Sequence, residues 1–410
     1  MPTYLAPDIY VEEVPAAAKP IEAVGTGTGG FIGVAPAAGA RLNEAVAINN
    51  WAQFLREFVA EGSASTQLSH AVFGFFQNGG SRCYVVNVGE GGTIGGGGRN
   101  RTGLDLLEEI DEIAIVAAPG YTDPASYDAL LGHCERLQDR VAILDGPAQV
   151  DDVSLLTEMA TPGDLAEGGA EDAADGTAER PRARRGLRAR QSDGGYGAFY
   201  FPWITVRDPL APNQLVNVPP SGHLAGIWAR TDASRGVQKA PANETIIGAL
   251  NVTYRITRAE AGELNQASVN TIRLFAREGI RVWGARTLAA SSSEWRYLNV
   301  RRLVNQLKES IADGTRWIVF EPNDYTLWKN IRRDITAFLK GFWRGGALMG
   351  RTPEEAFFVK CDEETNPPDS VAQGIVVTLV GIAPVKPAEF IVFRISQFER
   401  GVDVETQGGA

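Results

Sequence analysis

Apolar positions along the chain switch between helical and strand-like spacing, and this switching outlines the expected elements. Three short runs are almost continuously apolar, as in strands buried on both faces of a sheet, and cover residues 82–88, 113–119 and 141–145. Helical spacing lies around them, with apolar residues three and four apart in segments 49–58, 68–78 and 125–140. The alternation predicts a parallel sheet with helices on its faces, which is an α/β architecture.

The second half of the chain predicts more strands and two long helices. Aromatic and β-branched residues indicate strands at 196–206, 270–275, 280–288 and 317–320. One helix is expected over 295–311, because its apolar residues form a single stripe: Val300, Leu303, Val304, Leu307 and Ile311. A second amphipathic helix is expected to run to about Trp343, capped by Asn323 or Asp324.

Segment 374–398 predicts a β-hairpin. Its first strand covers 375–382, two prolines in segment 384–387 supply the turn, and its second strand covers 390–398. The strand positions expected to accept or donate pairing are Ile375, Val377, Leu379, Ile391, Phe393 and Ile395. Two strands alone are marginal in water, so this hairpin needs further strands or helices.

The N-terminus contains an extended segment that could supply such a strand. Residues 1–20 hold four prolines, and the strand-forming stretch between two of them comprises Ile9, Tyr10, Val11, Glu12 and Val14. This stretch is too short to form a core of its own. We therefore expect open β-edges near the end of the chain to be completed by extended arms, including arms from other copies.

Composition and charge narrow the possible functions. With 410 residues, 44% of them hydrophobic, the chain is long enough for two or three domains. The three cysteines, Cys83, Cys134 and Cys361, are too few and scattered for a disulfide framework or zinc site and are expected in the core. A net charge of −11 argues against a dedicated nucleic-acid binder. No signal peptide or membrane-spanning run is recognisable, so we expect a soluble product without membrane insertion.

Candidate catalytic and cofactor residues are weakly supported. Gly25, Gly27 and Gly30 form a GxGxxG, but strand-like residues follow it where a dinucleotide site needs a helix. Asp145 ends a predicted strand, and Asp151 and Asp152 follow, so a carboxylate site is conceivable; no nucleophile motif or metal-spaced partner accompanies them.

The histidines offer no catalytic pattern either. Ser221 and His223 lie two residues apart, which gives no nucleophile pair without a third group. The remaining histidines, His70 and His133, are in no recognisable motif. We expect no cofactor and no metal site.

Residues 161–195 are the clearest change in composition. An acidic half containing Asp164 and Glu179 runs into a basic half from Arg180 to Arg190, with few large apolar residues. The segment is expected to be a mobile surface insertion. Its arginines alone would suggest nucleic acid, but the acidic half favours self-neutralisation or a contact between subunits.

The helix that ends near Trp343 has a basic outer face, made of Lys329, Arg332, Arg333, Lys340 and Arg344. Its plain interpretation is a solvated surface. In an acidic chain, a helix face of one sign is also a candidate for docking an acidic partner.

Several separated motifs resemble the contractile tail sheath protein family. They are the N-terminal run YLAPDIYVEEVP with PIEAVGT, and the C-terminal runs YLNVRRL and WIVFEPN together with the strand at 390–398. The resemblance covers both ends and, loosely, the strand at 141–145. It has no counterpart for the 161–195 insertion.

The resemblance implies a fold and a domain plan. It implies an α/β fold, α+β overall, with a middle subtilisin-like, non-catalytic domain and a C-terminal sheath domain completed by exchanged N- and C-terminal arms. The corresponding segments are a linker arm at 1–20, core at 21–100, middle domain at 101–289, sheath domain at 290–398 and tail at 399–410.

The resemblance also implies a function and partners. It implies a structural subunit, not an enzyme, that forms helically stacked rings of six around an inner tube and contracts. The basic helix would face that tube, and baseplate and tail-terminator proteins would be further partners. Assembly would occur in the bacterial cytoplasm, in a phage tail, bacteriocin or phage-like injection particle. The alternatives are a sheath-terminating or scaffold protein of the same particle and, from another class, an α/β hydrolase.

Overall fold

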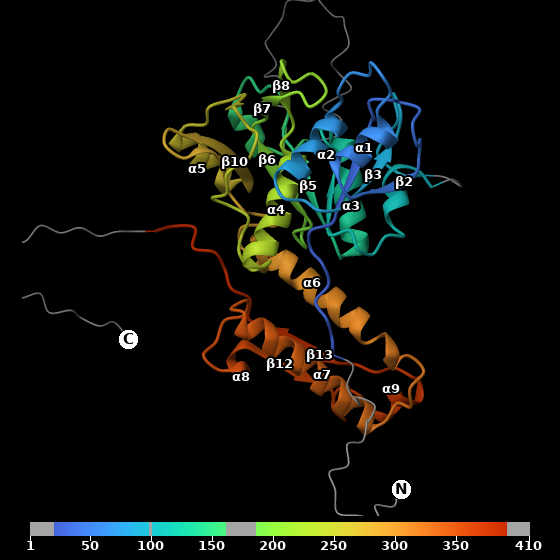
Figure 1. The fold of residues 1–410 in the computed structure, drawn as a ribbon. Coiled ribbons are helices and arrows are strands. Elements are labelled where there is room, and N and C mark those ends of the chain that lie inside the picture. The colour runs from blue at the N-terminus through green and yellow to red at the C-terminus, as the bar shows by residue number, and fades with distance from the viewer. Residues whose placement is uncertain (1–19, 98–100, 161–185, 392–410) are drawn as a thin grey trace, which may run out of the picture.

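The computed structural model describes residues 20–97, 101–160 and 186–391, which form two lobes joined by one long helix (Figure 1). The upper lobe holds a large sheet with helices on both faces. The lower lobe is small and is built around helix α7 (Tyr325–Arg344). Helix α6 (Leu298–Gly314) runs from one lobe to the other.

The upper lobe contains an eight-stranded sheet of order β11-β10-β6-β5-β4-β1-β3-β2. Its strands are β1 (Gly29–Gly33), β2 (Ala45–Ile48), β3 (Cys83–Asn87), β4 (Ile115–Ala117), β5 (Val141–Asp145), β6 (Gly197–Phe201), β10 (Val269–Phe275) and β11 (Gly279–Trp283). The six inner strands are mutually parallel, and only β2 and β11 pair antiparallel at the edges. The predicted α/β architecture with a parallel sheet is confirmed. Strands from segments 21–100 and 101–289 share this one sheet.

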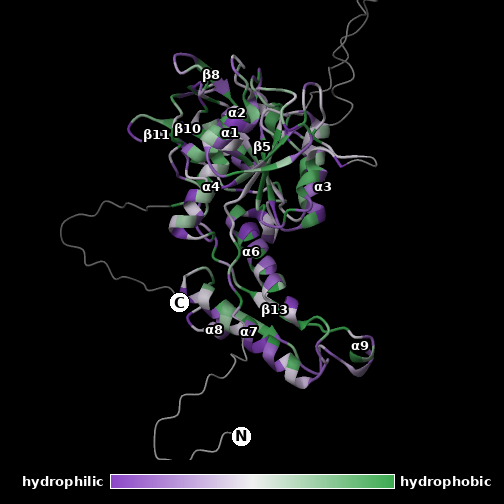
Figure 2. Cartoon of the chain, turned by 45° about the vertical axis from the view of Figure 1, so that its right-hand side comes forward, coloured by the Kyte–Doolittle hydropathy of each residue, from purple (hydrophilic) through white to green (hydrophobic). Residues whose placement is uncertain are grey.

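The inner strands send alternate side chains to two separate cores. In β5, Val141 and Ile143 pack into one core and Ala142 and Leu144 into the other. The first core is covered by α1 (Trp51–Phe58), α2 (Gln67–Gln77) and α4 (Ser221–Arg235); the second is covered by α3 (Pro124–Leu137) and α5 (Arg258–Gln266). Burial on both faces explains why these strands read as continuous apolar runs. Figure 2 shows hydrophobic strands inside the lobe and hydrophilic residues over its outer surfaces.

A second, three-stranded sheet of order β8-β7-β9 lies beside the first core. Its strands are β7 (Ile204–Arg207), β8 (Leu215–Val218) and β9 (Asn251–Val252). The predicted strand at 196–206 is therefore two strands, β6 and β7. Short 3-10 helices at Gly103–Leu107, Val153–Thr157 and Glu294–Arg296 fill connections.

The lower lobe packs around a third core. It contains α8 (Pro353–Ala356), α9 (Pro368–Ala372) and a two-stranded sheet of β12 (Phe357–Lys360) and β13 (Leu379–Ile382). Apolar residues of α6 and α7 meet in this core, and the predicted stripe residues Leu303 and Leu307 are buried there. Asp324 caps α7 by accepting from the Leu327 N–H, as predicted. None of the helices within the described ranges has the length and apolar character needed to cross a bilayer.

Two predictions for this lobe are wrong. Residues 317–320 are not a strand, because a 3-10 helix covers Arg316–Ile318 and Phe320 is fully exposed with φ of 72°. The hairpin is also wrong in its described part. The first strand is only Leu379–Ile382, and it pairs with β12, which lies earlier in the chain. After Pro384 the chain continues away from β13 without turning back, because Val385 and later residues bond to other elements.

Candidate assembly surfaces

Asp145 lies at the carboxyl end of β5, where the sequence placed it, but its surroundings are those of a structural residue. Its carboxylate accepts hydrogen bonds from the Ser221 N–H at 2.9 Å, the Ser221 hydroxyl at 2.7 Å and the Gly120 N–H at 3.3 Å. Burial raises the pKa of Asp145 to about 7, although the bonds from Ser221 and Gly120 oppose that rise. The side chain is 2% exposed, so no substrate can reach it.

Ser221 and His223 do not form a nucleophile pair. Ser221 begins α4 and donates to Asp145, while His223 points into the contact between α4 and α2, where its ring lies against Gly74. Burial lowers the pKa of His223 to about 3 and that of His133 to about 4, so both are neutral at physiological pH. His70 lies near Asp208 and is also buried, which lowers its pKa. Among the described residues, no serine or cysteine is bonded to a histidine, as nucleophilic catalysis requires.

The other candidate sites also have structural roles. Asp151 and Asp152 line a separate cavity of about 250 Å³ near Tyr254 and do not meet Asp145. All three cysteines are buried and free, as predicted. The glycine-rich run enters strand β1, and the next described helix begins only at Trp51, so no helix N-terminus faces those glycines. Within 20–97, 101–160 and 186–391, no group of three or more His, Cys, Asp or Glu side chains could hold a metal ion.

The first described residues form an extended segment that is bonded along α6. Val24 exchanges hydrogen bonds with Ser310 and Gln306, at 3.0 and 2.9 Å. Ile21 packs into the lower-lobe core, against Gly314. This segment, 20–28, crosses from the lower lobe to β1 and fixes where the chain's N-terminal residues leave the body (Figure 1).

A buried ion pair holds the segment 20–28 at its other end. Arg302 of α6 lies 2.5 Å from the Asp232 carboxylate and donates to the Thr26 carbonyl at 3.0 Å, while the Thr26 hydroxyl bonds Asp232. Arg302 and Asp232 have side chains only 3% and 7% exposed, and the guanidinium lies over the Trp228 ring. The pair therefore links α6, α4 and the N-terminal segment. Separating them would leave a buried charge without its partner, which is strongly unfavourable.

The C-terminal segment is anchored on the upper lobe. After β13, Val385 bonds to Ala347 and Asn299, and the chain then reaches Glu389. Glu389 makes a bidentate bond of 2.7 Å to Arg286, whose side chain is 4% exposed. Burial would raise the pKa of Glu389, but the bonds and charge of Arg286 outweigh it and hold the pKa below its usual range. The last described residues therefore lie beside the upper lobe, whereas the first described residues lie beside the lower lobe (Figure 1).

The β12–β13 sheet is an incomplete one. Each strand pairs only with the other among the described residues, so each keeps one edge without a described partner. Large apolar side chains are exposed on and beside it: Phe358, Ile375, Val377, Leu379 and Val380, between 37% and 59%. Two strands are marginal in water. Of the predicted strand positions Ile375, Val377 and Leu379, only Leu379 lies in a strand, and their pairing with an arm stays a prediction.

Helix α7 presents the predicted basic face. Lys329, Arg333, Lys340 and Arg344 are exposed, while Arg332 is half-buried. These four follow each other at spacings of four, seven and four residues, so they share one stripe of about 22 Å. Arg333 is bonded to Asp334 at 2.9 Å, and no acidic residue lies on the stripe itself.

The remaining predicted positions lie outside the described residues. They are Ile9, Tyr10, Val11, Glu12, Val14, Phe393 and Ile395, and residues 161–185 of the insertion. The end of the insertion, 186–195, is described and packs on α3, where Arg190 pairs with Asp128 and Glu135. Arg190 is thus neutralised by carboxylates of α3.

Sequence reasoning missed the residues that join the lobes. Arg302, Asp232 and Glu389 are distant in sequence from their partners. Polar residues on an amphipathic helix normally signal its exposed face, so the buried Arg301, Arg302 and Asn305 of α6 were not expected inside. The available signal was YLNVRRL, which places two arginines beside the apolar stripe of α6.

The chain matches known domain families and proteins. Residues 173–288 match the phage tail sheath protein central domain, and residues 290–398 match the phage tail sheath C-terminal domain. A putative prophage major tail sheath protein of Pseudomonas aeruginosa strain UCBPP-PA14 is 27% identical over 304 residues, which are 69% of this chain and 76% of that protein.

Two solved structures share the fold over nearly the whole chain. One is the PVC sheath complex of an extracellular contractile injection system in its contracted state, with a TM-score of 0.73 and 27% identity over 97% of this chain and 99% of that chain. The other is the six-fold symmetrised baseplate of the anti-feeding prophage, with a TM-score of 0.71 and 28% identity over 97% of this chain and 100% of that chain.

Proposed function

Because this chain belongs to the contractile tail sheath family, we propose that it is the structural subunit of a contractile sheath. Copies assemble as helically stacked rings of six around an inner tube, and contraction drives the tube through a target envelope. The six-fold symmetry of the related baseplate structure supports the ring size. The protein acts without catalysis, in keeping with a buried Asp145 and a Ser221 hydroxyl bonded to carboxylate instead of histidine.

The observation that carries the proposal is the incomplete β12–β13 sheet. It offers main-chain hydrogen-bonding groups beside exposed apolar side chains, which is what an added strand requires. Segments 1–19 and 392–410 hold the predicted strand-forming residues Ile9, Val11, Phe393 and Ile395. These arms add strands to the sheets of neighbouring copies. A contact of this kind is heterologous, and repeating it without closure builds a helical mesh.

The basic stripe of α7 is the surface that contacts the inner tube. Its four exposed cations stand out on a chain with a net charge of −11, and charge complementarity would set the register of sheath on tube. Baseplate and tail-terminator proteins are the further partners. Nucleic acid and membrane insertion have no place in this function.

Contraction proceeds by rigid-body movement of the subunits. The Arg302–Asp232 pair and the Glu389 anchor tie the described terminal segments to the body, so a pull on either arm is transmitted to both lobes. The arms keep neighbours connected while new subunit contacts form and lower the free energy. We place assembly in the bacterial cytoplasm, within a phage tail or a phage-like particle.

The test is negative-stain electron microscopy of the full chain, alone and coexpressed with the inner-tube protein, against a variant lacking residues 1–18. We expect striated tubes from the full chain and dispersed subunits from the truncated one. A second variant replaces Ile9 and Val11 by serine, which keeps the length of the arm and lowers its tendency to form a strand. It should also give dispersed subunits, because the proposed link depends on the strand and not on the length of the arm. Dispersed subunits from the full chain with and without the tube protein would contradict the proposed function.

A further inference from the structure

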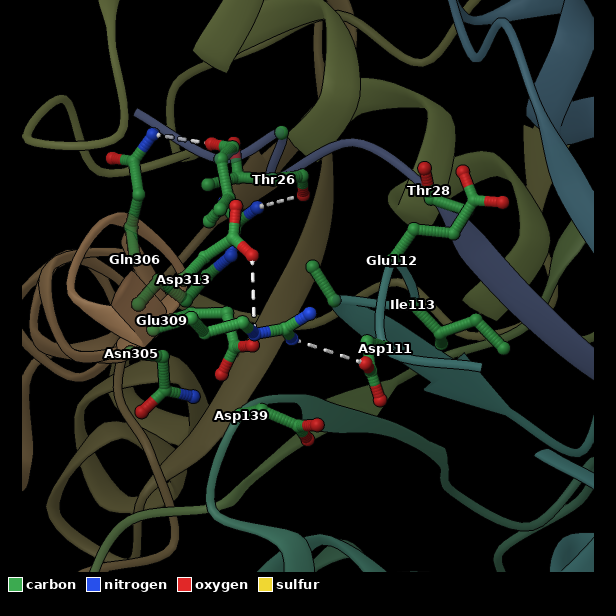
Figure 3. Close-up of a pocket in the computed structure, with 15 residues that line it drawn as sticks. Thr26, Thr28, Asp111, Glu112, Ile113, Asp139, Asn305, Gln306, Glu309 and Asp313 are labelled. Carbon is green, nitrogen blue, oxygen red and sulfur yellow. Dashed lines mark hydrogen bonds and ion pairs between the residues drawn. The ribbon is translucent and has the colours of Figure 1, made fainter. Parts of the chain in front are cut away.

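A cavity of about 400 Å³ opens between the upper lobe and α6 (Figure 3). Its walls are the N-terminal segment Val24–Thr28, the loop before β4, Asp139 and one side of α6. It is separate from the β12–β13 sheet and the basic stripe of α7, and none of the functions above uses it.

Carboxylates dominate the cavity. Five carboxylates line it against two guanidinium groups. Four of the five form ion pairs within the chain: Glu112 with Arg82, Asp139 with Arg140, and both Asp111 and Asp313 with the single guanidinium of Arg316. The fifth, Glu309, has no hydrogen bond or ion pair to the described residues. Burial and the neighbouring Asp139 and Asp111 raise its pKa and outweigh the opposing charge of Arg316, as expected for a carboxylate that no cation contacts directly.

A buried amide donor is also unpaired at this cavity. Asn305 is 4% exposed, and its Oδ1 accepts from Arg301 Nε at 2.9 Å, which fixes the orientation of the amide. Its Nδ2 has no partner among the described residues. Figure 3 shows this nitrogen on the side of the amide that faces Asp139. An unpaired buried donor destabilises the protein, so the site favours an incoming hydrogen-bond acceptor.

The two unmet groups together define the chemistry of a ligand. Glu309 requires a cation, whereas Asn305 Nδ2 requires a hydrogen-bond acceptor. A bare metal ion cannot accept from the amide, and an anion is repelled by the carboxylates. A lysine or arginine residue meets both needs, because its side chain is cationic and its backbone carbonyl accepts. We propose that this cavity binds a lysine or arginine residue of a second copy of this chain.

The choice of a second copy rests on the proposed function. In a sheath each copy is surrounded by others, and the cavity lies beside the segment that leads to the N-terminal arm. The chain presents exposed cations that have no described partner, such as Arg255, Arg277 and Lys386. The occupant would touch both the upper lobe and α6, because residues of both line the cavity.

The ligand chemistry can be tested without any assembly. The probe is N-acetyl-arginine N-methylamide, and its matched control is the citrulline analogue, which has nearly the same shape and no charge. Calorimetry uses the full-length Ile9→Ser, Val11→Ser variant, whose weakened arm keeps it dispersed and its cavity free, and it should show saturable binding of the arginine probe only. Glu309→Gln should weaken it about tenfold or more, while Glu354→Gln, an exposed carboxylate of the lower lobe, should leave it unchanged. Two results would overturn the site. One is equal binding of the arginine probe and the citrulline analogue, and the other is equal affinity of the arginine probe for the Glu309→Gln and Glu354→Gln variants.

The identity of the occupant needs assembled protein. A photo-crosslinking residue at Asp313, on the rim, is introduced into a mixture of ¹⁴N- and ¹⁵N-labelled chains. We expect mixed-isotope cross-linked peptides that contain lysine or arginine. Cross-links confined to single-isotope peptides in assembled tubes would overturn the second copy as occupant. If no tubes form, the proposed function fails, and the probe experiment still decides the site.

Discussion

At the residue scale, buried polar groups hold elements together that the sequence alone does not bring into contact. Asp145 illustrates this. Helix α4 begins at Ser221, and the residue before it, Pro220, has no side-chain cap for the helix. The Asp145 carboxylate, from the neighbouring β5, accepts the Ser221 N–H and so caps α4 from outside the helix. The residue that looked like a candidate catalytic carboxylate is therefore a helix cap supplied by the sheet.

Asp145 should make stability depend on pH. Its folded pKa of about 7 lies above its ordinary value of 3.8, so the folded state binds the proton more tightly. This contribution to stability is full below about pH 4 and is lost as pH rises through 7, by about 1.4 kcal/mol per unit of pKa difference. We predict that Asp145→Asn removes this fall, as measured by urea unfolding between pH 4 and 8. Asp151→Asn, on an exposed carboxylate, should keep the wild-type profile; parallel profiles for wild type and Asp145→Asn would contradict the prediction.

At the element scale, α2 and α4 pack unusually closely because glycines face the partner helix. A side chain on Gly222 would lie 2.2 Å from the Ala71 backbone, and one on Gly226 would lie 2.4 Å from the Phe75 carbonyl oxygen. The close approach of the two helices leaves Trp228 of α4 fully buried. From the sequence alone, the same glycines would be expected to weaken the helix. Their position against α2 explains why glycine is needed there.

Gly222→Ala should destabilise the protein even though alanine favours helices. The added methyl meets backbone atoms that cannot rotate away, so we expect a loss of about 1–3 kcal/mol in the free energy of unfolding. The matched control is Gly262→Ala in α5, where nothing lies within 4 Å and the intrinsic preference should stabilise by up to about 1 kcal/mol. Urea unfolding checks both, and a stabilising Gly222→Ala would show that the two helices separate easily.

At the scale of the whole molecule, charge is distributed unevenly. The chain is acidic overall, yet α7 carries a stripe of four exposed cations, and the cavity between the upper lobe and α6 is acidic. The N-terminal segment begins in the lower-lobe core at Ile21, whereas the C-terminal segment is anchored on the upper lobe at Arg286. This layout gives each copy several distinct surfaces for different neighbours, as a helical lattice requires.

Reversing charge on the α7 stripe should separate tube binding from folding. We predict that Arg333→Glu with Lys340→Glu keeps the melting temperature within a few degrees but yields sheaths without an inner tube, or no sheaths, when both proteins are coexpressed. The control, Arg56→Glu with Arg207→Glu, changes net charge equally on the upper lobe, at exposed residues that already have partners within the chain, and should leave assembly unchanged. Electron microscopy of the purified particles is the measurement. Normal sheaths on tubes from the α7 variant would exclude this helix as the tube contact.

The sequence by itself determined the elements that depend on neighbouring residues. The strand at Val141–Asp145, the Asp324 cap and the amphipathic faces of α6 and α7 follow from spacing and from local hydrogen bonding, which act over a few residues. The motifs at the two ends also carried the family resemblance, which the domain and structure matches confirm.

Tertiary structure decided everything that depends on which distant residues meet. It paired β13 with β12, which lies earlier in the chain, made 316–318 a 3-10 helix, and buried Arg301 and Arg302 on a helix whose pattern suggested a polar outer face. It also joined Glu389 to Arg286 and left Glu309 and Asn305 unpaired in one cavity. The physical reason is that strand pairing, desolvation and charge neutralisation are properties of the assembled surroundings, whereas periodicity and capping are properties of the local chain.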